Sequence, residues 1–361
     1  MRERIKLFVA ACLYYSGLVK LLRWWTQRFG PRLIILNYHC AAGGDLHRHL
    51  LYLRRHYRLL HLEEALEELY TPRRQWKQPS DRRTPLVMTF DDGYRDNYTY
   101  GFPLVRELQV PITIFLIPGY MERGNCFWWQ EADHLVRHAH VDKVTIEGRT
   151  YHLGQPEERN ALVQTIDARV RYATSVAERE EFLALVREAL VVPSSVTLEE
   201  AVLPLKWAEV REMEESGWVS FGAHSMHHPI LACLRDVAEV QREVGECRTV
   251  MEQRLGHRVR IFAYPVGKPE HIGGEALRAV REVGYDWAVT AIGGINTPQG
   301  DPHQLRRIEI DVCHHWQIVA AETVGLWQFF SALVKNSIFS GRKDNKLAIN
   351  ASKYQLSANR R

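Results

Sequence analysis

Residues 86–93 read LVMTFDDG, an apolar run followed at once by two carboxylates and a glycine. A run of this kind is typical of a strand that is buried on both faces. In a regular strand Asp91 and Asp92 would point to opposite faces, because side chains alternate along it. Gly93 permits a turn directly after them, so both carboxylates can reach one site from different directions. The stretch therefore predicts a buried strand that ends in a functional turn.

Six further β-rich runs recur along the chain, with helical periodicity between them. The seven runs are 33–38, 86–90, 111–117, 219–223, 259–264, 287–291 and 305–310. Apolar strands that alternate with amphipathic helices indicate a parallel sheet covered on both sides. Seven such units favour a (β/α) barrel over an open doubly wound sheet. The expected fold is therefore α/β, with a barrel over residues 33–334.

The stretch 124–206 interrupts this alternation. It contains the hairpin pattern KVTIEGRTYHL at 143–153 and helical patterns near 156–172 and 176–190. We expect a mainly helical insertion that acts as a lid or a substrate-side subdomain. Trp128 and Trp129 near its start are expected to offer stacking surface to a glycan, although burial is the usual fate of aromatic residues.

Composition narrows the class of protein. The chain has 361 residues, of which 46% are hydrophobic and 25% charged, as in ordinary globular proteins. Its formal net charge of +4 is too small to indicate a nucleic-acid partner. The six cysteines show no short paired spacing, which is typical of free thiols in a reducing compartment and favours a cytoplasmic location.

Both ends of the chain are apolar and basic. Residues 1–32 combine 13 uncharged residues with Trp24 and Trp25, which suits either a helix at a membrane interface or one packed on the barrel. Residues 316–334 predict a long apolar helix with the same two alternatives, and the basic tail 335–361 is expected to be disordered. Together these segments favour a peripheral protein of the inner membrane, with a soluble protein as the alternative.

Unusual residues follow three of the predicted strands: DDG at 91–93, HSMHHP at 224–229 and YPVG at 264–267. The carboxyl ends of parallel barrel strands share one face, where active sites lie. His224 and His228 are four residues apart and can meet one metal ion. Two imidazoles and a carboxylate would leave open positions for water and substrate, as in catalytic sites.

The motifs TFDDG, HSMHHP and FAYPVG resemble the first three motifs of the NodB-type polysaccharide deacetylases. These metal-dependent enzymes remove N- or O-acetyl groups from glycans on a distorted (β/α)7 barrel. The resemblance covers roughly residues 33–312 without the insertion. It implies that Asp91 is the general base and that Asp92, His224 and His228 bind one divalent ion, expected to be zinc.

The third motif implies further roles near the substrate. By its alignment the N–H of Val266 faces the developing oxyanion, while Tyr264 and Pro265 shape the wall. Trp287 is a candidate for the acetyl pocket, with a core position as the alternative.

Two positions depart from the family pattern. Many members carry an arginine that orients the base, where this chain has Ala263; its substitute could be Arg260, Arg306 or Arg307, and the sequence does not choose. The fifth-motif histidine, the usual general acid, is also displaced. The candidates are His39 in LNYHC, which we favour as a site residue, and His314 or His315.

The expected function is a metal-dependent hydrolase of carbon–nitrogen bonds. It would remove an acyl group, foremost N-acetyl, from a sugar of an envelope or exopolysaccharide glycan or of its lipid-linked precursor. Two alternatives stay open. The departures would suit an inactive glycan-binding barrel, and a two-histidine-one-carboxylate site also serves non-haem iron oxygenases.

Overall fold

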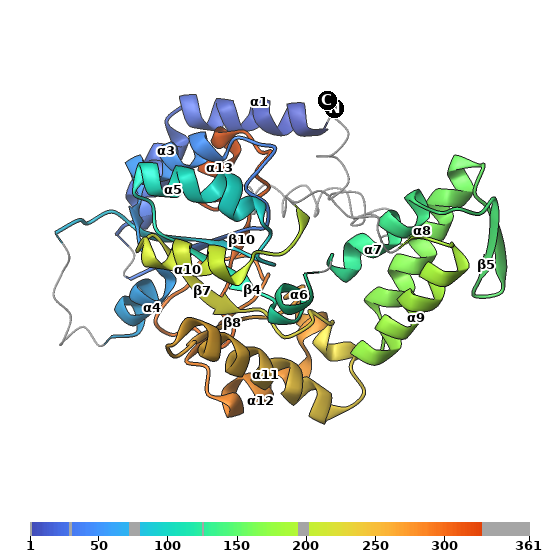
Figure 1. Ribbon diagram of the computed structural model, residues 1–361. Coiled ribbons are helices and arrows are strands. Elements are labelled where there is room, and N and C mark those ends of the chain that lie inside the picture. Colours follow the sequence, from blue (N-terminus) through green and yellow to red (C-terminus); the bar gives the residue numbers. More distant parts are fainter. Residues whose placement is uncertain (1, 29–30, 72–79, 125, 194–201, 327–361) are drawn as a thin grey trace, which may run out of the picture.

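The computed structural model describes residues 2–28, 31–71, 80–124, 126–193 and 202–326 (Figure 1). At its centre lies a parallel sheet whose strand order is β10-β1-β3-β4-β7-β8-β9. These strands are β1 (Ile34–Tyr38), β3 (Pro85–Phe90), β4 (Ile112–Leu116), β7 (Val219–Ala223), β8 (Ile261–Ala263), β9 (Trp287–Val289) and β10 (Ile308–Glu309). Each lies within one of the seven predicted runs or extends it by one residue, and the predicted barrel fold is confirmed.

The sheet closes on itself through the segment before β10. Leu305 forms a parallel bridge with Val289 of β9, and Leu36 of β1 pairs with Ile308 of β10. The two-residue strand β2 (Arg58–Leu59), which the sequence did not predict, pairs with the start of β3. The last strands are short, so the barrel is distorted where it closes.

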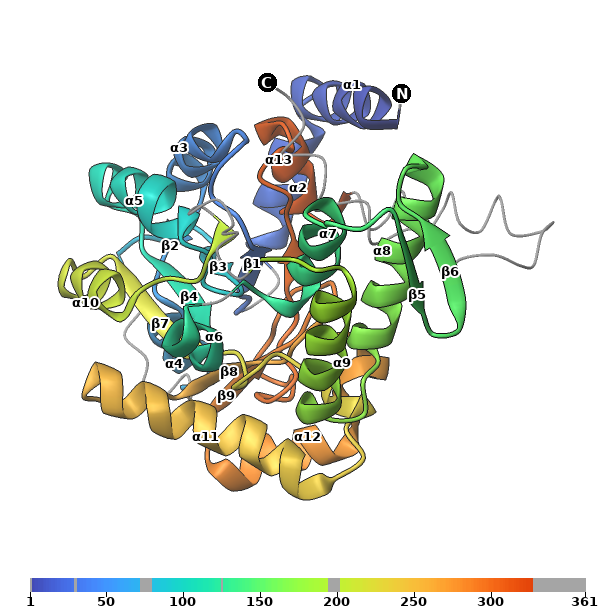
Figure 2. The same ribbon diagram turned by 45° about the vertical axis from the view of Figure 1, so that its right-hand side comes forward.

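Helices cover the outside of the barrel (Figures 1 and 2). They are α3 (Leu46–His56), α5 (Phe102–Leu108) after the π-helical turn η1 (Asn97–Gly101), α10 (Trp207–Glu215), the 3₁₀ turn η3 (Leu231–Cys233), α11 (Val237–Leu255) and α12 (Pro269–Val283). Local signals set their ends: Asp236 caps α11 by accepting from the N–H of Ala238, and α12 ends at Gly284 with φ 87°.

Helix α4 (Leu62–Tyr70) has a different task, because it closes the amino end of the barrel. Its residues Leu62 and Leu66 belong to the same apolar cluster as the inward-facing Val87 and Phe115. This cluster fills the barrel interior below the carboxyl ends of the strands. The opposite end is left for polar side chains.

Most of the stretch between β4 and β7, up to α9, leaves the barrel (Figure 1). It comprises α6 (Pro118–Arg123), α7 (Trp128–Arg137), the hairpin of β5 (Lys143–Ile146) and β6 (Arg149–His152), α8 (Pro156–Arg171) and α9 (Val176–Ala189). Glu147 and Gly148 both have positive φ, the geometry of a tight two-residue hairpin turn. Leu135, Ile166 and Val186 belong to a second apolar cluster, so the insertion has a core of its own.

The amino-terminal segment forms two helices, where the sequence suggested one. Helix α1 (Arg2–Tyr15) and helix α2 (Leu18–Thr26) are separated at Gly17, which has φ 80°. No single helix of the described residues is long and apolar enough to cross a membrane; α1 and α2 satisfy length and composition only together, bent by 69°.

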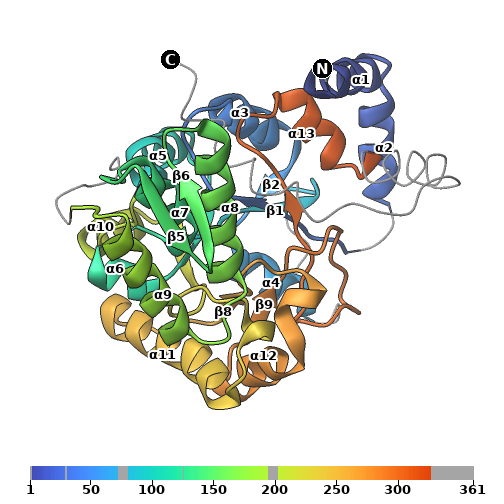
Figure 3. The same ribbon diagram turned by 90° about the vertical axis from the view of Figure 1, so that its right-hand side faces the viewer.

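The predicted long helix over 316–334 is interrupted after Glu322, and its part from residue 327 onward lies outside the described residues. Helix α13 (Trp316–Glu322) ends at a turn in which Gly325 has φ 75°. Its middle residues are buried, and it packs against α1 and α3 (Figure 3). The predicted tail 335–361 lies outside the described residues.

Candidate active site

The carboxyl ends of β3 and β7 bring together three side chains of types that can bind a metal ion. Asp92 Oδ1 lies 3.5 Å from His224 Nε2 and 3.6 Å from His228 Nε2. All three side chains are buried, and their ligand atoms lie within 4.8 Å of one another. The structure thus assembles the predicted ligand set from positions up to 136 residues apart in the chain.

The hydrogen bonds around these side chains suit a cation. His224 Nδ1 donates to the carbonyl of Ala263 at 2.8 Å, which directs Nε2, the other ring nitrogen, toward Asp92. Burial, and next the nearby His224, lower the pKa of His228 to about 3, so its imidazole is neutral at neutral pH. Asp92 Oδ1 is buried and has no hydrogen-bond partner among the described residues. A divalent ion bound by all three groups would satisfy this oxygen.

The backbone is strained at this end of the barrel. Of the seven non-glycine residues with positive φ in the described part of the chain, four lie here: Asp92, Ser225, His228 and Val266. Such conformations cost on the order of 1–3 kcal/mol each and persist where surrounding structure enforces them. For His228 one such contact is visible, because its N–H donates to Ser225 Oγ at 2.9 Å.

Asp91 faces a different partner from its neighbour Asp92. The guanidinium of Arg307 donates to it through both terminal nitrogens, from Nη1 to Oδ1 at 2.7 Å and from Nη2 to Oδ2 at 2.8 Å. Both residues are buried. Burial by itself raises the pKa of Asp91, but the charge of Arg307 outweighs it and holds the pKa well below its usual range. Asp91 is therefore an ionised carboxylate in fixed orientation.

Arg307 resolves the choice among the three candidate arginines. It also donates to the carbonyl of Thr290, to Asn37 Oδ1 and to Thr89 Oγ1, so every contact keeps it inside the barrel. Arg260 instead binds Asp286 before β9, and Arg306 donates to the carbonyl of Gly293. Closure of the barrel next to β10 therefore supplies the arginine that Ala263 does not.

His39 lies at the end of β1, close enough to lower the pKa of both Asp91 and Asp92 in part. The alternatives lie elsewhere: the carbonyl of His314 contacts the buried His49, and His315 caps α13.

The loop after His39 is held by a residue that the sequence analysis missed. Asp96 accepts hydrogen bonds from the N–H groups of Ala41 and Ala42. Asp96 ends the stretch DDGYRD at 91–96. A third carboxylate so close to the Asp91–Asp92 pair was the sequence signal that could have identified it as a residue of the site.

Two of the predicted wall residues are placed differently. Tyr264 packs against Phe262 and donates to the carbonyl of His303, on the outer side of the sheet. Trp287 is the first residue of β9 and lies under the guanidinium of Arg260 at 4.5 Å, at the amino end of the barrel. The position of Trp287 agrees with the core alternative, and the wall role of Tyr264 stays a prediction.

The other residues of the third motif stay at the mouth. Pro265 is buried and Val266 is half-buried directly after β8. Among the described residues none accepts a hydrogen bond from the backbone N–H of Val266.

The insertion contacts the metal-binding loop from the other side. Trp128 Nε1 donates to the carbonyl of His228 at 2.9 Å, and Arg179 donates to the carbonyl of His227 at 3.1 Å. The Trp128 side chain is fully buried, so it offers no stacking surface to a glycan, contrary to expectation. Trp129 is only half-buried, and its ring centre lies 4.7 Å from the ring centre of His228.

His227 is turned away from the ligand set. Its Nδ1 lies 2.7 Å from Glu243 Oε1, and its N–H donates to Glu243 Oε2. The middle of the HSMHHP motif therefore anchors the loop to α11, while its two ends face Asp92.

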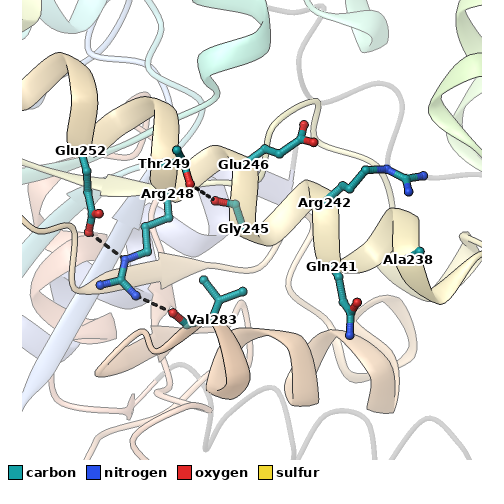
Figure 4. A pocket seen from close by; sticks show the side chains of 9 residues that line it. All are labelled: Ala238, Gln241, Arg242, Gly245, Glu246, Arg248, Thr249, Glu252 and Val283. Atoms are coloured by element: carbon teal, nitrogen blue, oxygen red, sulfur yellow. Dashed lines mark hydrogen bonds and ion pairs between the residues drawn. The ribbon is translucent and has the colours of Figure 1, made fainter.

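A surface hollow between α11 and α12 is separate from this site (Figure 4). Arg248 crosses it and binds Glu252 and the carbonyl of Val283. None of the residues at the barrel mouth lines this hollow.

Solved structures of other proteins have a similar fold. The Streptococcus pyogenes deacetylase PplD, in complex with acetate, is 16% identical with a TM-score of 0.52, over 81% of this chain and 99% of that one. IcaB from Ammonifex degensii is 18% identical with a TM-score of 0.52, over 82% and 98%. These likenesses concern the fold.

Sequence comparison identifies the family. YxkH of Bacillus subtilis (strain 168), named as a polysaccharide deacetylase, is 21% identical over 296 residues, which are 79% of this chain and 74% of that protein. Residues 78–288, more than half of the chain, match the family model described as polysaccharide deacetylase. The chain, with its barrel and the motifs at its mouth, is therefore a member of the polysaccharide deacetylase family, hydrolases that act on the carbon–nitrogen bonds of acetylated sugars.

Proposed function

We propose that this protein removes an acetyl group from an N-acetylated sugar in an envelope or exopolysaccharide glycan, or in its lipid-linked precursor, with the help of one divalent metal ion. The observation that carries the proposal is the buried trio Asp92, His224 and His228 beside the Asp91–Arg307 pair. Family membership and the deacetylase names of the relatives support the acetylated glycan as substrate.

The donor set favours zinc as the ion. Two neutral imidazoles and one carboxylate are the ligands of many catalytic zinc sites, which keep a further position open. Related divalent ions accept the same donors, and geometry and availability select among them. When bound, such an ion would polarise the acyl carbonyl and lower the pKa of water in the site to about 7.

The residues of the chain supply the remaining steps. Asp91, ionised and oriented by Arg307, takes a proton from the water as its oxygen adds to the acyl carbon. The N–H of Val266 is available to donate to the oxyanion that develops there. The carbon–nitrogen bond then breaks, and a protonated group must deliver a proton to the leaving nitrogen. We assign this role to His39, whose proximity helps to lower the pKa of both aspartates. The products are acetate and the free amino sugar.

Acetate release tests the proposal. Purified protein would be incubated with a panel of N-acetylated glycans and lipid-linked sugars, with chelator, and with chelator followed by Zn²⁺, Co²⁺ or Mg²⁺. We expect release that chelator abolishes and that one or more ions restore. Release that is unaffected by exhaustive chelation would refute the metal role, and no release from any acetylated sugar would refute the reaction.

The inactive-barrel alternative loses its main argument in the structure. It rested on the missing third-motif arginine and on the displaced acid histidine, and Arg307, directly before β10, makes the contact expected of the arginine. The acid role of His39 is part of the proposal. The iron-oxygenase alternative shares only the type of ligand set. Oxygen consumption with Fe²⁺ and a 2-oxo acid, measured beside acetate release, separates the two reactions.

A further inference from the structure

Helices α1 and α2 each carry an apolar stripe on their outer side. On α1 the stripe comprises Ile5, Phe8, Cys12 and Tyr15, with Phe8 69% and Tyr15 76% exposed. On α2 it comprises Leu21, Trp24 and Trp25, each about half exposed. Within each helix the spacing of three or four residues places these side chains on one face.

The inner sides of the same helices are already packed. Ala10 and Val19 are buried, and the ring of Tyr14 meets that of Trp316 edge-on at 4.9 Å. Arg23 donates to the hydroxyl of Tyr52 on α3 at 2.9 Å. Both helices are therefore attached to the barrel by one face, while the opposite face carries the exposed apolar side chains.

These stripes form a concentrated surface. Of the twelve large exposed hydrophobic residues in the described part of the chain, six lie on α1 and α2. Scattered exposed apolar residues need no explanation, whereas a contiguous patch indicates a partner. We call the outer face of residues 5–25 the α1–α2 face; the two helices follow one another with a bend of 69° at one edge of the molecule (Figure 3).

The distribution of charge indicates which partner. Residues 1–28 hold six basic residues against Glu3 alone, a net charge of +5, and 335–361 carry +6. Because the whole chain carries +4, the 306 residues between them carry −7. Like charges would oppose the pairing of two α1–α2 faces across a dimer. A basic, tryptophan-bearing face is what an anionic lipid surface attracts.

The aromatic residues support the same partner. The guanidinium of Arg28 lies 3.9 Å from the ring centre of Trp24. Tryptophan and tyrosine prefer the headgroup level of a bilayer, where an apolar ring and a polar edge are both accommodated. Trp24, Trp25 and Tyr15 are thus suited to insert their rings while the basic residues contact phosphate.

We propose that the α1–α2 face lies on the surface of an anionic phospholipid bilayer and holds the barrel there. Helix α13, which the sequence analysis had also considered for membrane contact, is buried between α1 and the barrel and therefore does not add to this surface. Attachment through two short amphipathic helices is reversible and depends on both buried apolar area and charge.

Vesicle co-sedimentation of the full chain tests this. Vesicles of phosphatidylcholine with a quarter phosphatidylglycerol would be compared with phosphatidylcholine alone, at low and high salt. We expect sedimentation with the anionic vesicles at low salt, and weaker binding at high salt or without the anionic lipid. Removal of 335–361 should weaken binding through lost charge without abolishing it.

Two substitutions on the α1–α2 face provide the sharper comparison. The double variant Phe8→Ser, Trp24→Ser should bind anionic vesicles about tenfold or more weakly, because two exposed rings are lost. The matched control is Leu185→Ser, which removes an apolar side chain that is 64% exposed on α9, far along the chain. It should bind as the unmodified protein does, and all three proteins should melt at similar temperatures.

Three outcomes would overturn the proposal. One is the absence of sedimentation with anionic vesicles, and another is equal binding by the double variant and the control. The third is a combination of two results: the unmodified protein does not bind vesicles, and light scattering shows that it forms a dimer which the double variant does not form. That result would assign the α1–α2 face to a second copy of the chain.

Discussion

The two sides of the active site contribute different kinds of contact. The barrel side supplies charged and metal-ligand-type side chains, namely Asp91, Asp92, His224 and Arg307. On the insertion side, Trp128 and Arg179 donate to backbone carbonyls of the loop 224–229, and the ring of Trp129 packs on that of His228. Under the proposed function the barrel would carry the chemistry, whereas the insertion would position one ligand loop. Substitutions on the two sides should change different measured quantities.

The largest effect is expected at a metal ligand. His228→Ala should lose the bound ion, because two ligands rarely hold a catalytic zinc, and acetate release should fall to the level of chelated protein. Metal content of the purified variant measures this. The control is His227→Ala, one residue away but bound to Glu243, which should keep its metal. Undiminished metal in His228→Ala would contradict the ligand assignment.

Asp91→Asn should come next, with metal retained and turnover reduced by about 10²–10⁴-fold, since it removes a general base and no ligand. Steady-state kinetics on metal-loaded protein provides the measurement. Were the variant to lose its metal instead, the roles of Asp91 and Asp92 would be exchanged.

Arg307→Lys tests the orientation of the base. Lysine keeps the charge but not the two-pronged contact, so turnover should fall by about tenfold or more while the affinity for metal is unchanged. Arg307→Met removes the charge, and burial then raises the pKa of Asp91. Activity should be lost as pH falls through this raised pKa and regained at higher pH.

The stability of these variants separates orientation from unfolding. An unpaired buried carboxylate in Arg307→Met should cost about 3–5 kcal/mol of unfolding free energy near neutral pH. A pH profile of Arg307→Lys that matches the unmodified protein, together with unchanged turnover, would rule out a role for Arg307 in positioning the base.

A smaller effect is expected on the insertion side, at Trp128→Phe. This change removes the indole N–H that binds the carbonyl of His228, so metal affinity should fall by about tenfold. At saturating metal, turnover should be nearly unchanged. Trp207→Phe is the matched control, because its indole N–H binds Glu122 at the surface. A loss of turnover at saturating metal would place the insertion in the chemistry itself.

The smallest effect is expected at Trp129→Leu, near the opening. If this ring contacts the glycan, KM for a polymeric substrate should rise by less than about tenfold, with a small acetylated model substrate unaffected. Equal changes on both substrates would show that Trp129 acts only by packing against His228.

Local sequence patterns determined the parts of this protein that depend on neighbouring residues. The apolar runs predicted all seven strands, because burial on both faces leaves a continuous signal. The stretches 91–93 and 224–229 predicted the metal-ligand set, because a turn after a parallel strand directs its side chains to one shared face. Those inferences need only a strand, its end and the residues that follow.

The tertiary structure decided what depends on partners far apart in the chain. Arg307 reaches Asp91 across 216 residues because the segment before β10 closes the barrel, and no local pattern distinguished it from Arg260 or Arg306. The position of Trp287 was left open for a related reason: alternation along a strand predicts the face of a side chain, not its depth in the barrel. The end of α13 at Glu322 and the burial of Trp128 likewise depend on what packs beside them. Closure, depth and burial are properties of the assembled barrel, so sequence reasoning left them open.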